Sequence, residues 1–215
     1  MIEIYTGVPG SGKSAHAARD IRHNLNRRDP HPVIANFELA EKAPVRNRER
    51  FVYIPNAEMS VDALKSFACD WWESRGYMRE EGIDLYLDEA QLLWNSRNWS
   101  QKGRLEWLEF LSQSRKYGYH IVFIAQSAAM IDNQFRMLIE IEVNHRRLQN
   151  MGLMGWLMAL PFGGKLVCGV RMMFQIRQRI GATYFVLSPK DWAMYDSYKR
   201  FDRQDAERLK LVKPA

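Results

Sequence analysis

The stretch Gly7-Val8-Pro9-Gly10-Ser11-Gly12-Lys13-Ser14 decides the fold predicted for this chain. It has the spacing G-x-x-x-x-G-K-S, follows the apolar run Ile2–Thr6, and precedes a segment with apolar residues at helical spacing. In such a strand–loop–helix setting, glycines let the backbone curl until successive N–H groups point at a phosphate, and the helix N-terminus favours its negative charge. The stretch therefore predicts a phosphate-binding loop, the P-loop, at residues 7–14 rather than a chance glycine-rich turn.

Side chains and backbone of this loop are both expected to contact a nucleoside triphosphate. Lys13 would bring a positive charge to the β- and γ-phosphates, and the Ser14 hydroxyl would bind Mg²⁺. The predicted cofactors are therefore ATP and Mg²⁺, although no pocket in the sequence separates ATP from GTP. The residues predicted to contact the nucleotide are Gly7, Val8, Pro9, Gly10, Ser11, Gly12, Lys13, Ser14 and Ala15.

Two adjacent carboxylates, Asp88 and Glu89, follow the apolar run 83–87. Open parallel sheets bind their ligands at the carboxyl ends of the strands, which is where this pair would lie. Asp88 is predicted to hold Mg²⁺ together with Ser14, and Glu89 to polarise a water toward the γ-phosphate. A solvated acidic turn is the alternative, and the P-loop makes it the weaker one. A strand that ends in Asp-Glu favours hydrolysis over transfer to an acceptor.

Two further side chains are candidates for the reaction itself. Gln126 follows the run 119–125, expected beside the strand of Asp88, so its amide could sense the γ-phosphate or align the water. Arg115 is a candidate arginine finger for a neighbouring subunit, although the helix dipole alone also favours a cation there. Arg97 competes for the same role. The predicted catalytic residues are Lys13, Glu89, Gln126 and Arg115.

Strand and helix patterns alternate along the first half of the chain, which predicts parallel strands joined by right-handed crossovers. The expected fold class is α/β: a three-layer P-loop NTPase with a mainly parallel central sheet and a small β-rich C-terminal extension. The predicted division is an ATPase core at 1–130 and an extension at 131–215 packed on it. The expected strands are 2–6, 32–37, 51–54, 83–87, 119–125, 139–148, 167–179 and 183–187. The expected helices are 14–26, 61–75 with Ser60 as N-cap, 104–117 with Leu105, Leu108 and Leu111 on its apolar face, and 131–138.

Composition excludes several classes of protein. Hydrophobic residues make up 47% of the 215 residues and charged residues 26%, so a packed core is expected. Cys69 and Cys168 lack metal-ligand spacing, so both are expected to be reduced core thiols of a cytosolic protein. The sequence shows no signal peptide and no apolar run long enough for an integral membrane span.

Two features leave alternatives open. The apolar stretch 151–160 is predicted to be a core element of the extension, with an exposed surface for a subunit or a membrane protein as the alternative. The net charge of +6 is compatible with nucleic acid, with an anionic membrane surface, or with an ordinary solvated surface. Solvated strand faces are the commoner explanation for the basic residues after the core. The residues of the alternative, a DNA-facing surface, are His145, Arg146, Arg147, Arg171, Phe174, Arg177, Arg179 and Tyr184.

Together these motifs resemble the zonular occludens toxin (Zot) family, which includes the assembly ATPases of filamentous phages and belongs with the FtsK–HerA group of P-loop motors. The resemblance covers most of the chain, and its more specific parts are the Asp-Glu-Ala-Gln stretch and the arginine–glycine–strand–glutamine stretch. The segments that carry it are 1–14, 34–39, 87–91 with Ser96 and Arg97, 114–118 leading to Ala125 and Gln126, 130–136 and 195–198.

The resemblance implies an ATPase that forms a ring with copies of itself, six being one candidate number, and that helps to extrude phage DNA while coat protein is added. It implies phage single-stranded DNA and coat or inner-membrane assembly proteins as partners, and the host bacterial cytoplasm, at the inner face of the inner membrane, as the location. Members of the phage-assembly kind usually continue into a transmembrane helix, which is not seen here up to Ala215. Two alternatives remain: a DNA-packaging or conjugative translocase of the same superfamily, and a nucleotide-switched scaffold with negligible turnover.

Overall fold

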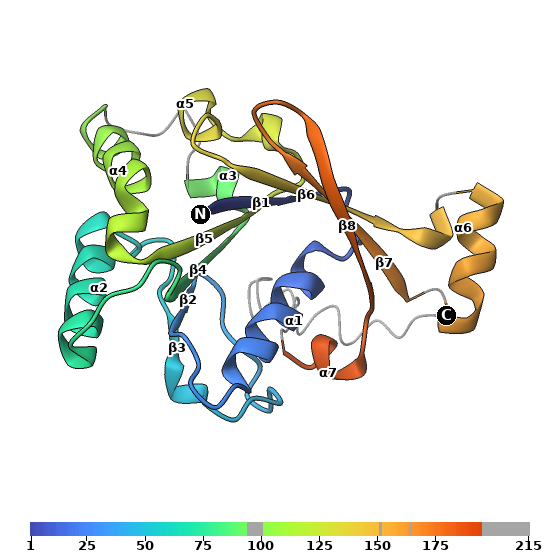
Figure 1. Cartoon of the computed structure of the whole chain (residues 1–215), viewed down its shortest axis with the longest axis horizontal. Coiled ribbons are helices and arrows are strands. Elements are labelled where there is room, and N and C mark those ends of the chain that lie inside the picture. The colour runs from blue at the N-terminus through green and yellow to red at the C-terminus, as the bar shows by residue number, and fades with distance from the viewer. Residues whose placement is uncertain (94–100, 151, 164, 195–215) are drawn as a thin grey trace, which may run out of the picture.

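The computed structural model describes residues 1–93, 101–150, 152–163 and 165–194. Arg97 and the segment 195–198 lie outside these described residues. Within them, the strands form one eight-stranded sheet in the order β3-β2-β4-β5-β1-β6-β7-β8 (Figure 1). The strands are β1 Ile2–Thr6, β2 Val33–Ala35, β3 Phe51–Tyr53, β4 Ile83–Asp88, β5 Tyr119–Ile124, β6 Ile141–Arg147, β7 Leu166–Met173 and β8 Gln178–Val186.

The central sheet is mainly parallel, as the alternating pattern predicts. All pairings from β3 across to β6 are parallel, and only β6–β7 and β7–β8 are antiparallel. The carboxyl ends of β1, β4, β5 and β6 therefore share one edge of the sheet. This edge carries the candidate site.

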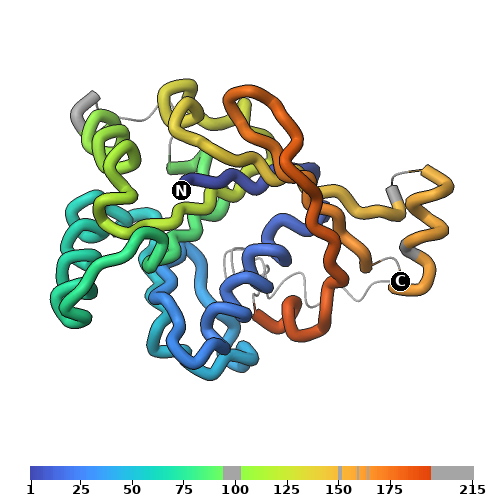
Figure 2. The backbone as a smooth tube through the Cα atoms, in the orientation of Figure 1, coloured from blue at the N-terminus to red at the C-terminus, as the bar shows by residue number. Residues whose placement is uncertain are grey.

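Helices cover both faces of the parallel part, which gives the three expected layers (Figures 1 and 2). On one face α1 buries Ala17, Ala18 and Ile21 against strand residues such as Tyr5 and Val122. On the other face α2 and α4 pack over a larger cluster. The helices are α1 Lys13–Leu25, α2 Val61–Arg75, α3 Ala90–Leu93, α4 Gln101–Gln113, α5 Asn133–Arg136, α6 Gly152–Ala159 and α7 Pro189–Trp192. Short 3₁₀ turns lie at Arg48–Arg50, Ser114–Tyr117, Ala128–Met130, Leu148–Asn150 and Leu160–Phe162.

Helix α2 begins and ends where its sequence predicts. The Ser60 hydroxyl accepts a hydrogen bond from the backbone N–H of Ala63 at 3.2 Å, and so caps one of the N–H groups that the first turn leaves unpaired. Gly76 ends the helix in the left-handed conformation with φ 69°, which glycine adopts without steric cost.

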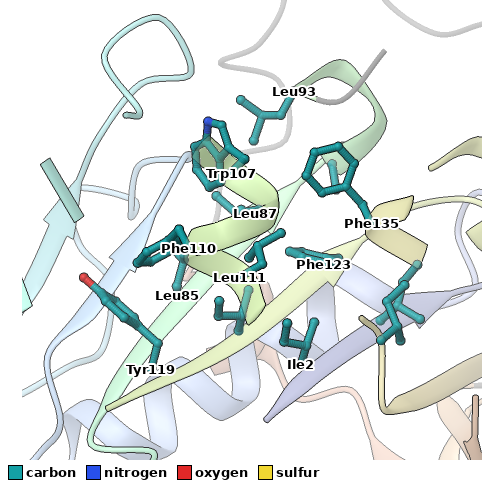
Figure 3. Packing of buried hydrophobic residues seen from close by; sticks show 14 of the residues in the cluster. Ile2, Leu85, Leu87, Leu93, Trp107, Phe110, Leu111, Tyr119, Phe123 and Phe135 are labelled. Atoms are coloured by element: carbon teal, nitrogen blue, oxygen red, sulfur yellow. The ribbon is translucent and has the colours of Figure 1, made fainter. Parts of the chain in front are cut away.

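The predicted apolar face of α4 is buried only in part: Leu111 is buried and Leu108 packs against the core, but Leu105 is exposed. Trp107, Phe110 and Leu111 point from α4 toward the strands (Figure 3), whereas Leu105 is 60% exposed. Three residues turn a helix by about 300°, which is about 60° less than a full turn. Leucines spaced by three therefore shift around the helix by about 60° at each step, and the first and last of them do not share the buried face. The stripe that is buried follows the i, i+3, i+4 pattern instead.

Beyond residue 130 the sheet continues without a break. β6 is still parallel to β1, with Ile4 paired to Glu142, and the direction reverses only after Arg147. The division of the chain into domains at residue 130 remains a prediction. The predicted strand 167–179 is interrupted, because the hairpin between β7 and β8 turns at 174–177, where Arg177 has a φ of 56°. The predicted helix 131–138 is the short α5, which is capped by Asp132.

One of the two cysteines lies outside the core. Cys168 is buried in β7, as expected, but Cys69 is exposed on α2, so this part of the prediction is wrong. Its neighbour Ala68 faces the core, and each further residue of a helix turns by about 100°, which directs Cys69 away from the sheet.

Candidate nucleotide-binding site

The P-loop has the backbone conformation that its glycines predict. Gly7, Gly10 and Gly12 all have positive φ values, of 137°, 74° and 104°. A Cβ at Gly7 would lie 2.5 Å from the carbonyl oxygen of His145, and one at Gly12 would lie 2.9 Å from Val167. The loop, which joins β1 to α1, therefore packs against β6 and β7 so closely that these positions have no room for a Cβ atom.

Lys13 begins α1, and its ammonium group lies over the loop. Its Nζ donates hydrogen bonds to the carbonyl oxygens of Gly7 at 2.7 Å and Val8 at 3.2 Å. Burial lowers the pKa of Lys13, while the carboxylates of Asp88 and Glu89 act in the opposite direction. The two predicted motifs thus lie close enough to interact electrostatically at the same edge of the sheet.

Asp88 is the last residue of β4, and its side chain is buried. The side chain of Asn36 pairs with the backbone of Asp88. The Asn36 amide accepts from the backbone N–H of Asp88 at 2.7 Å and donates to its carbonyl oxygen at 2.8 Å. It also donates to the side chain of Asn56 at 2.8 Å. Because the amide pairs with both backbone groups of Asp88, it fixes the residue at the end of its strand. Apart from the family resemblance, the sequence gives no signal for this role of Asn36.

We expect the substitution Asn36→Ala to lower the free energy of unfolding by about 2–3 kcal/mol, because it leaves a buried N–H and a buried carbonyl oxygen without a partner. Chemical denaturation measures this loss. Asn56→Ala removes only the exposed end of the same chain of hydrogen bonds and should change stability little. Equal losses in the two variants would show that the pairing with Asp88 is not what stabilises this edge.

Glu89 follows Asp88 with a backbone conformation that is unusual for its residue type. Its φ is 51°, in the left-handed region that non-glycine residues seldom adopt. Its N–H donates to the Asp88 carboxylate at 2.8 Å, and its own carboxylate accepts from the amide of Gln91. Backbone strain of this kind gathers at functional sites. The two adjacent carboxylates differ in exposure: Asp88 is buried, and Glu89 is partly exposed.

Gln126 reaches the same edge. It follows β5, which lies between β1 and β4 in the sheet, and its carbonyl oxygen accepts from the N–H of Gly7 at 3.2 Å. Its side chain is exposed. The structure therefore brings Gln126 together with the P-loop and with the strand of Asp88, as the sequence predicts.

Arg115 is not brought to this edge. It lies in the turn before β5, at the amino end of the parallel strands, and its guanidinium donates to the Glu140 carboxylate at 2.6 Å. Glu140 also accepts from the backbone N–H of Ile2 at the start of β1. Within one chain Arg115 and the P-loop therefore lie at opposite edges of the sheet, so any contact with a nucleotide would have to be made with a neighbouring subunit.

Arg147, which the sequence predicts only as a candidate for the DNA-facing surface, lies beside the P-loop. It ends β6, and its guanidinium lies 3.9 Å from where a Cβ of Gly10 would be. Its Nε and the hydroxyl oxygen of Ser11 are buried and have no hydrogen-bond partner within the described residues. The neighbouring Arg146 is exposed and donates to Asn144 at 3.2 Å. Only the parallel pairing of β6 with β1, which the sequence does not reveal, carries Arg147 to the P-loop.

Other members of the predicted DNA-facing group also make contacts within the chain. Arg171 pairs with the buried carboxylate of Glu3, and Arg177 pairs with Glu142 at 3.0 Å. Phe174 is buried beneath the Arg177 guanidinium, so it is not free to stack on bases, and this part of the prediction is wrong. Tyr184 is exposed, as the prediction requires.

A buried histidine pair lies directly behind the P-loop. Nδ1 of His16 and Nε2 of His145 are 2.7 Å apart, and Nδ1 of His145 lies 3.3 Å from the Thr6 carbonyl oxygen. Since that oxygen can only accept, His145 donates from Nδ1 and accepts at Nε2 from His16. Burial lowers the pKa of His16 to about 4 and that of His145 to about 3. Both rings are therefore neutral at physiological pH, and Lys13 and Arg147 supply the positive charge of this site.

Comparison with known proteins decides the family. The family model for the zonular occludens toxin (Zot) matches residues 1–184. The chain belongs to the Zot family. Relatives of this Zot chain include the Gene 1 proteins of several phages. That of Enterobacteria phage I2-2 is 38% identical over 186 residues, covering 77% of this chain and 46% of the relative. That of Enterobacteria phage M13 is 35% identical over 175 residues, covering 77% and 48%. The Zot chain thus spans about half the length of these relatives.

Solved structures agree with the fold of the Zot chain. The N-terminal domain of zonular occludens toxin from Neisseria meningitidis superposes with a TM-score of 0.56 at 16% identity, covering 91% of this chain and 98% of that one. The DNA-packaging ATPase B204 from Sulfolobus Turreted Icosahedral Virus superposes with a TM-score of 0.51 at 12% identity, covering 87% and 97%. The mixed α/β fold with a mostly parallel sheet is therefore that of Zot and P-loop ATPase domains.

Proposed function

We propose that this chain is the ATP-hydrolysing motor domain of a filamentous-phage assembly machine, and that hydrolysis drives DNA extrusion. One observation carries the enzymatic part. Lys13 at the start of α1, Asp88 at the end of β4 and the strained Glu89 meet at one edge of the sheet, where burial and both carboxylates affect the pKa of the lysine. The relationship to the phage Gene 1 proteins supports the biological setting.

The residues of this edge fit Mg²⁺–ATP. The glycine cradle leaves no room for a Cβ at Gly7 or Gly12, and the buried Ser11 hydroxyl has no partner among the described residues. Ser14 and Asp88 would hold the Mg²⁺, which would neutralise charge on the phosphates. Lys13 would exchange its two carbonyl partners for phosphate oxygens.

Glu89 would act as the general base that accepts a proton from the attacking water. Its carboxylate is partly exposed, so water can reach it, and the amide of Gln91 fixes its direction. Gln126, whose carbonyl oxygen accepts a hydrogen bond from the N–H of Gly7, would respond to the γ-phosphate. A conformational response there would pass directly along β5 to the turn that carries Arg115.

The motor is proposed to act as a ring of identical subunits, six being one candidate number. Arg115, at the opposite edge of the sheet from the P-loop, would then approach the nucleotide of a neighbour, and Arg97 remains its competitor. Such an arrangement requires the Arg115–Glu140 ion pair to open on assembly. Phage single-stranded DNA and coat or inner-membrane assembly proteins are the proposed partners, in the host bacterial cytoplasm at the inner face of the inner membrane.

Arg147 is proposed to contact the nucleotide phosphates within the same subunit. We expect Arg147→Ala to weaken ATP binding by about tenfold or more, since a hydrogen bond to a charged group contributes about 1.5–3 kcal/mol. Titration with a fluorescent ATP analogue measures the change. Arg146→Ala, which removes the adjacent exposed guanidinium, is the matched control and should bind as the wild type does. Equal affinity in both variants would remove Arg147 from the site.

Release of phage particles tests the whole proposal. A phage genome with Lys13→Ala or Glu89→Gln in this reading frame should accumulate phage DNA in the host and release almost no particles. A nucleotide-switched scaffold would instead tolerate Glu89→Gln, because ATP still binds. Normal release from both variants would contradict the motor role. ATPase activity that rises on addition of double-stranded DNA would favour a packaging or conjugative translocase.

A further inference from the structure

Helix α6 is the most exposed apolar element of the described chain. Its residues were predicted to form part of a core, but the large side chains of 153–162 are between 45% and 74% exposed, and the prediction is wrong. Figures 1 and 2 show α6 projecting at one end of the sheet, away from α1, α2 and α4. The exposed side chains are Leu153, Met154, Trp156, Leu157, Met158, Leu160 and Phe162.

The apolar surface of α6 is too wide for an ordinary docking stripe. At about 100° per residue, the exposed side chains from Trp156 round to Met158 cover an arc of about 200°, and Gly152 and Gly155 lie on the remaining side. A helix that packs on a protein surface needs an apolar stripe only about 100° wide. An apolar stripe about twice as wide is covered fully only when an apolar medium surrounds the helix on several sides.

The chain enters and leaves this element at one place. The segment follows β6, which ends at Arg147, and precedes β7, which begins at Leu166. β6 and β7 are antiparallel neighbours in the sheet. Leu148 packs on Leu166 and Cys168 at the base. The described residues 148–150, 152–163 and 165 therefore form a wedge that leaves the sheet and returns to it. Among the described residues no helix combines the length and the apolar character that crossing a bilayer requires.

The charged residues that flank the wedge along the chain are cations. Arg146 and Arg147 precede it, and Lys165 stands at its end. Two of these cations, Arg146 and Lys165, are exposed on either side of the wedge base. An apolar wedge with cations at its base is complementary to a bilayer with anionic headgroups.

The apolar surface extends from the wedge base onto β8. Tyr184 pairs with Cys168, and Val186 pairs with Leu166, so these exposed side chains share the face of the sheet that packs on Leu148. The opposite face is covered, because Val167, Phe185 and Leu187 pack on Ala15 of α1. Tyr184 and Val186 thus add exposed apolar side chains to the face of the sheet next to Leu148.

We propose that the wedge, through its described apolar side chains at 153–162, inserts into the surface of an anionic phospholipid bilayer, with Arg146 and Lys165 at the headgroups. This contact does not depend on ATP hydrolysis. It would orient the sheet relative to the membrane through a segment between two strands.

The test is co-sedimentation of the full chain with vesicles of phosphatidylcholine alone and of phosphatidylcholine mixed with phosphatidylglycerol. The wild type should sediment with the mixed vesicles and much less with the neutral ones. The double variant Leu153→Asp/Leu157→Asp should bind the mixed vesicles about tenfold or more weakly, because a carboxylate is costly in an apolar medium. The control Tyr77→Asp/Met78→Asp, which changes two exposed apolar side chains before β4, should sediment as the wild type does. Unchanged thermal unfolding of both variants would show that they fold.

Two results would overturn the proposal. One is wild-type protein that does not sediment with anionic vesicles, or a wedge variant that sediments equally well. The other is a wedge variant that loses self-association in sedimentation velocity while its vesicle binding is unchanged, since the wedge would then be an interface between copies of this chain. Phosphate release from ATP in the absence of vesicles should be the same in the wedge variant and the wild type, so a failure of this proposal is distinguishable from a failure of the proposed ATPase.

Discussion

Replacing Glu89 with glutamine is expected to lower kcat for ATP hydrolysis by about 10²–10⁴-fold and to leave ATP affinity within about threefold of the wild type. The amide keeps the size and much of the hydrogen bonding of the carboxylate, but it cannot take a proton from water. Since Glu89 lies beside the site at a strained backbone position, the loss should fall on turnover rather than on binding. Phosphate release and a fluorescent-nucleotide titration measure the two quantities separately.

The matched control for this variant is Glu80→Gln, which neutralises an exposed carboxylate before β4, at the opposite edge of the sheet. It should change neither quantity. If Glu89→Gln hydrolyses ATP at the wild-type rate, the base is another residue. If the wild type itself shows no turnover, the chain is a nucleotide-switched scaffold.

Replacing Lys13 with alanine is expected to weaken ATP binding by about 30- to 1000-fold, the equivalent of about 2–4 kcal/mol for charge-assisted bonds to phosphate oxygens. Without nucleotide the variant should be about as stable as the wild type, because the lysine makes only two hydrogen bonds to loop carbonyl groups and its burial has a desolvation cost. Consequently ATP should raise the Tm of the wild type and not that of the variant.

Lys42→Ala removes an exposed lysine and serves as the control, with an unchanged response of Tm to ATP. A Lys13→Ala variant that binds ATP with wild-type affinity would place the nucleotide elsewhere on the molecule. A variant that is unfolded before nucleotide is added would show that Lys13 is structural.

The sequence predicts most of the parallel sheet and the P-loop because the signals for both are local. The glycines at 7, 10 and 12 and the cap at Ser60 act within a few residues of their own positions. Asp88 and Glu89 are also predicted from a local signal, because they directly follow an apolar strand. The residues predicted to bind nucleotide and metal stand at one edge of the sheet, while their roles remain predictions.

What the sequence does not predict depends on strand pairing. Arg147 reaches the P-loop because β6 lies parallel to β1, and Asn36 fixes Asp88 because β2 lies beside β4. Neither pairing leaves a local trace. The apolar stretch at α6 was assigned to a core because hydrophobic composition is the same for a buried helix and for one that meets an apolar medium. Only the position of α6, outside the sheet, separates the two.

The measurement that tests the central claim most directly is the release of inorganic phosphate from ATP by the wild-type chain, followed in Mg²⁺ and in EDTA over a range of protein concentrations. We expect Mg²⁺-dependent turnover whose rate per chain rises with concentration, because subunits supply an arginine to one another. This turnover should fall to background in Lys13→Ala. Phosphate release that never exceeds the Lys13→Ala background at any concentration would contradict this claim.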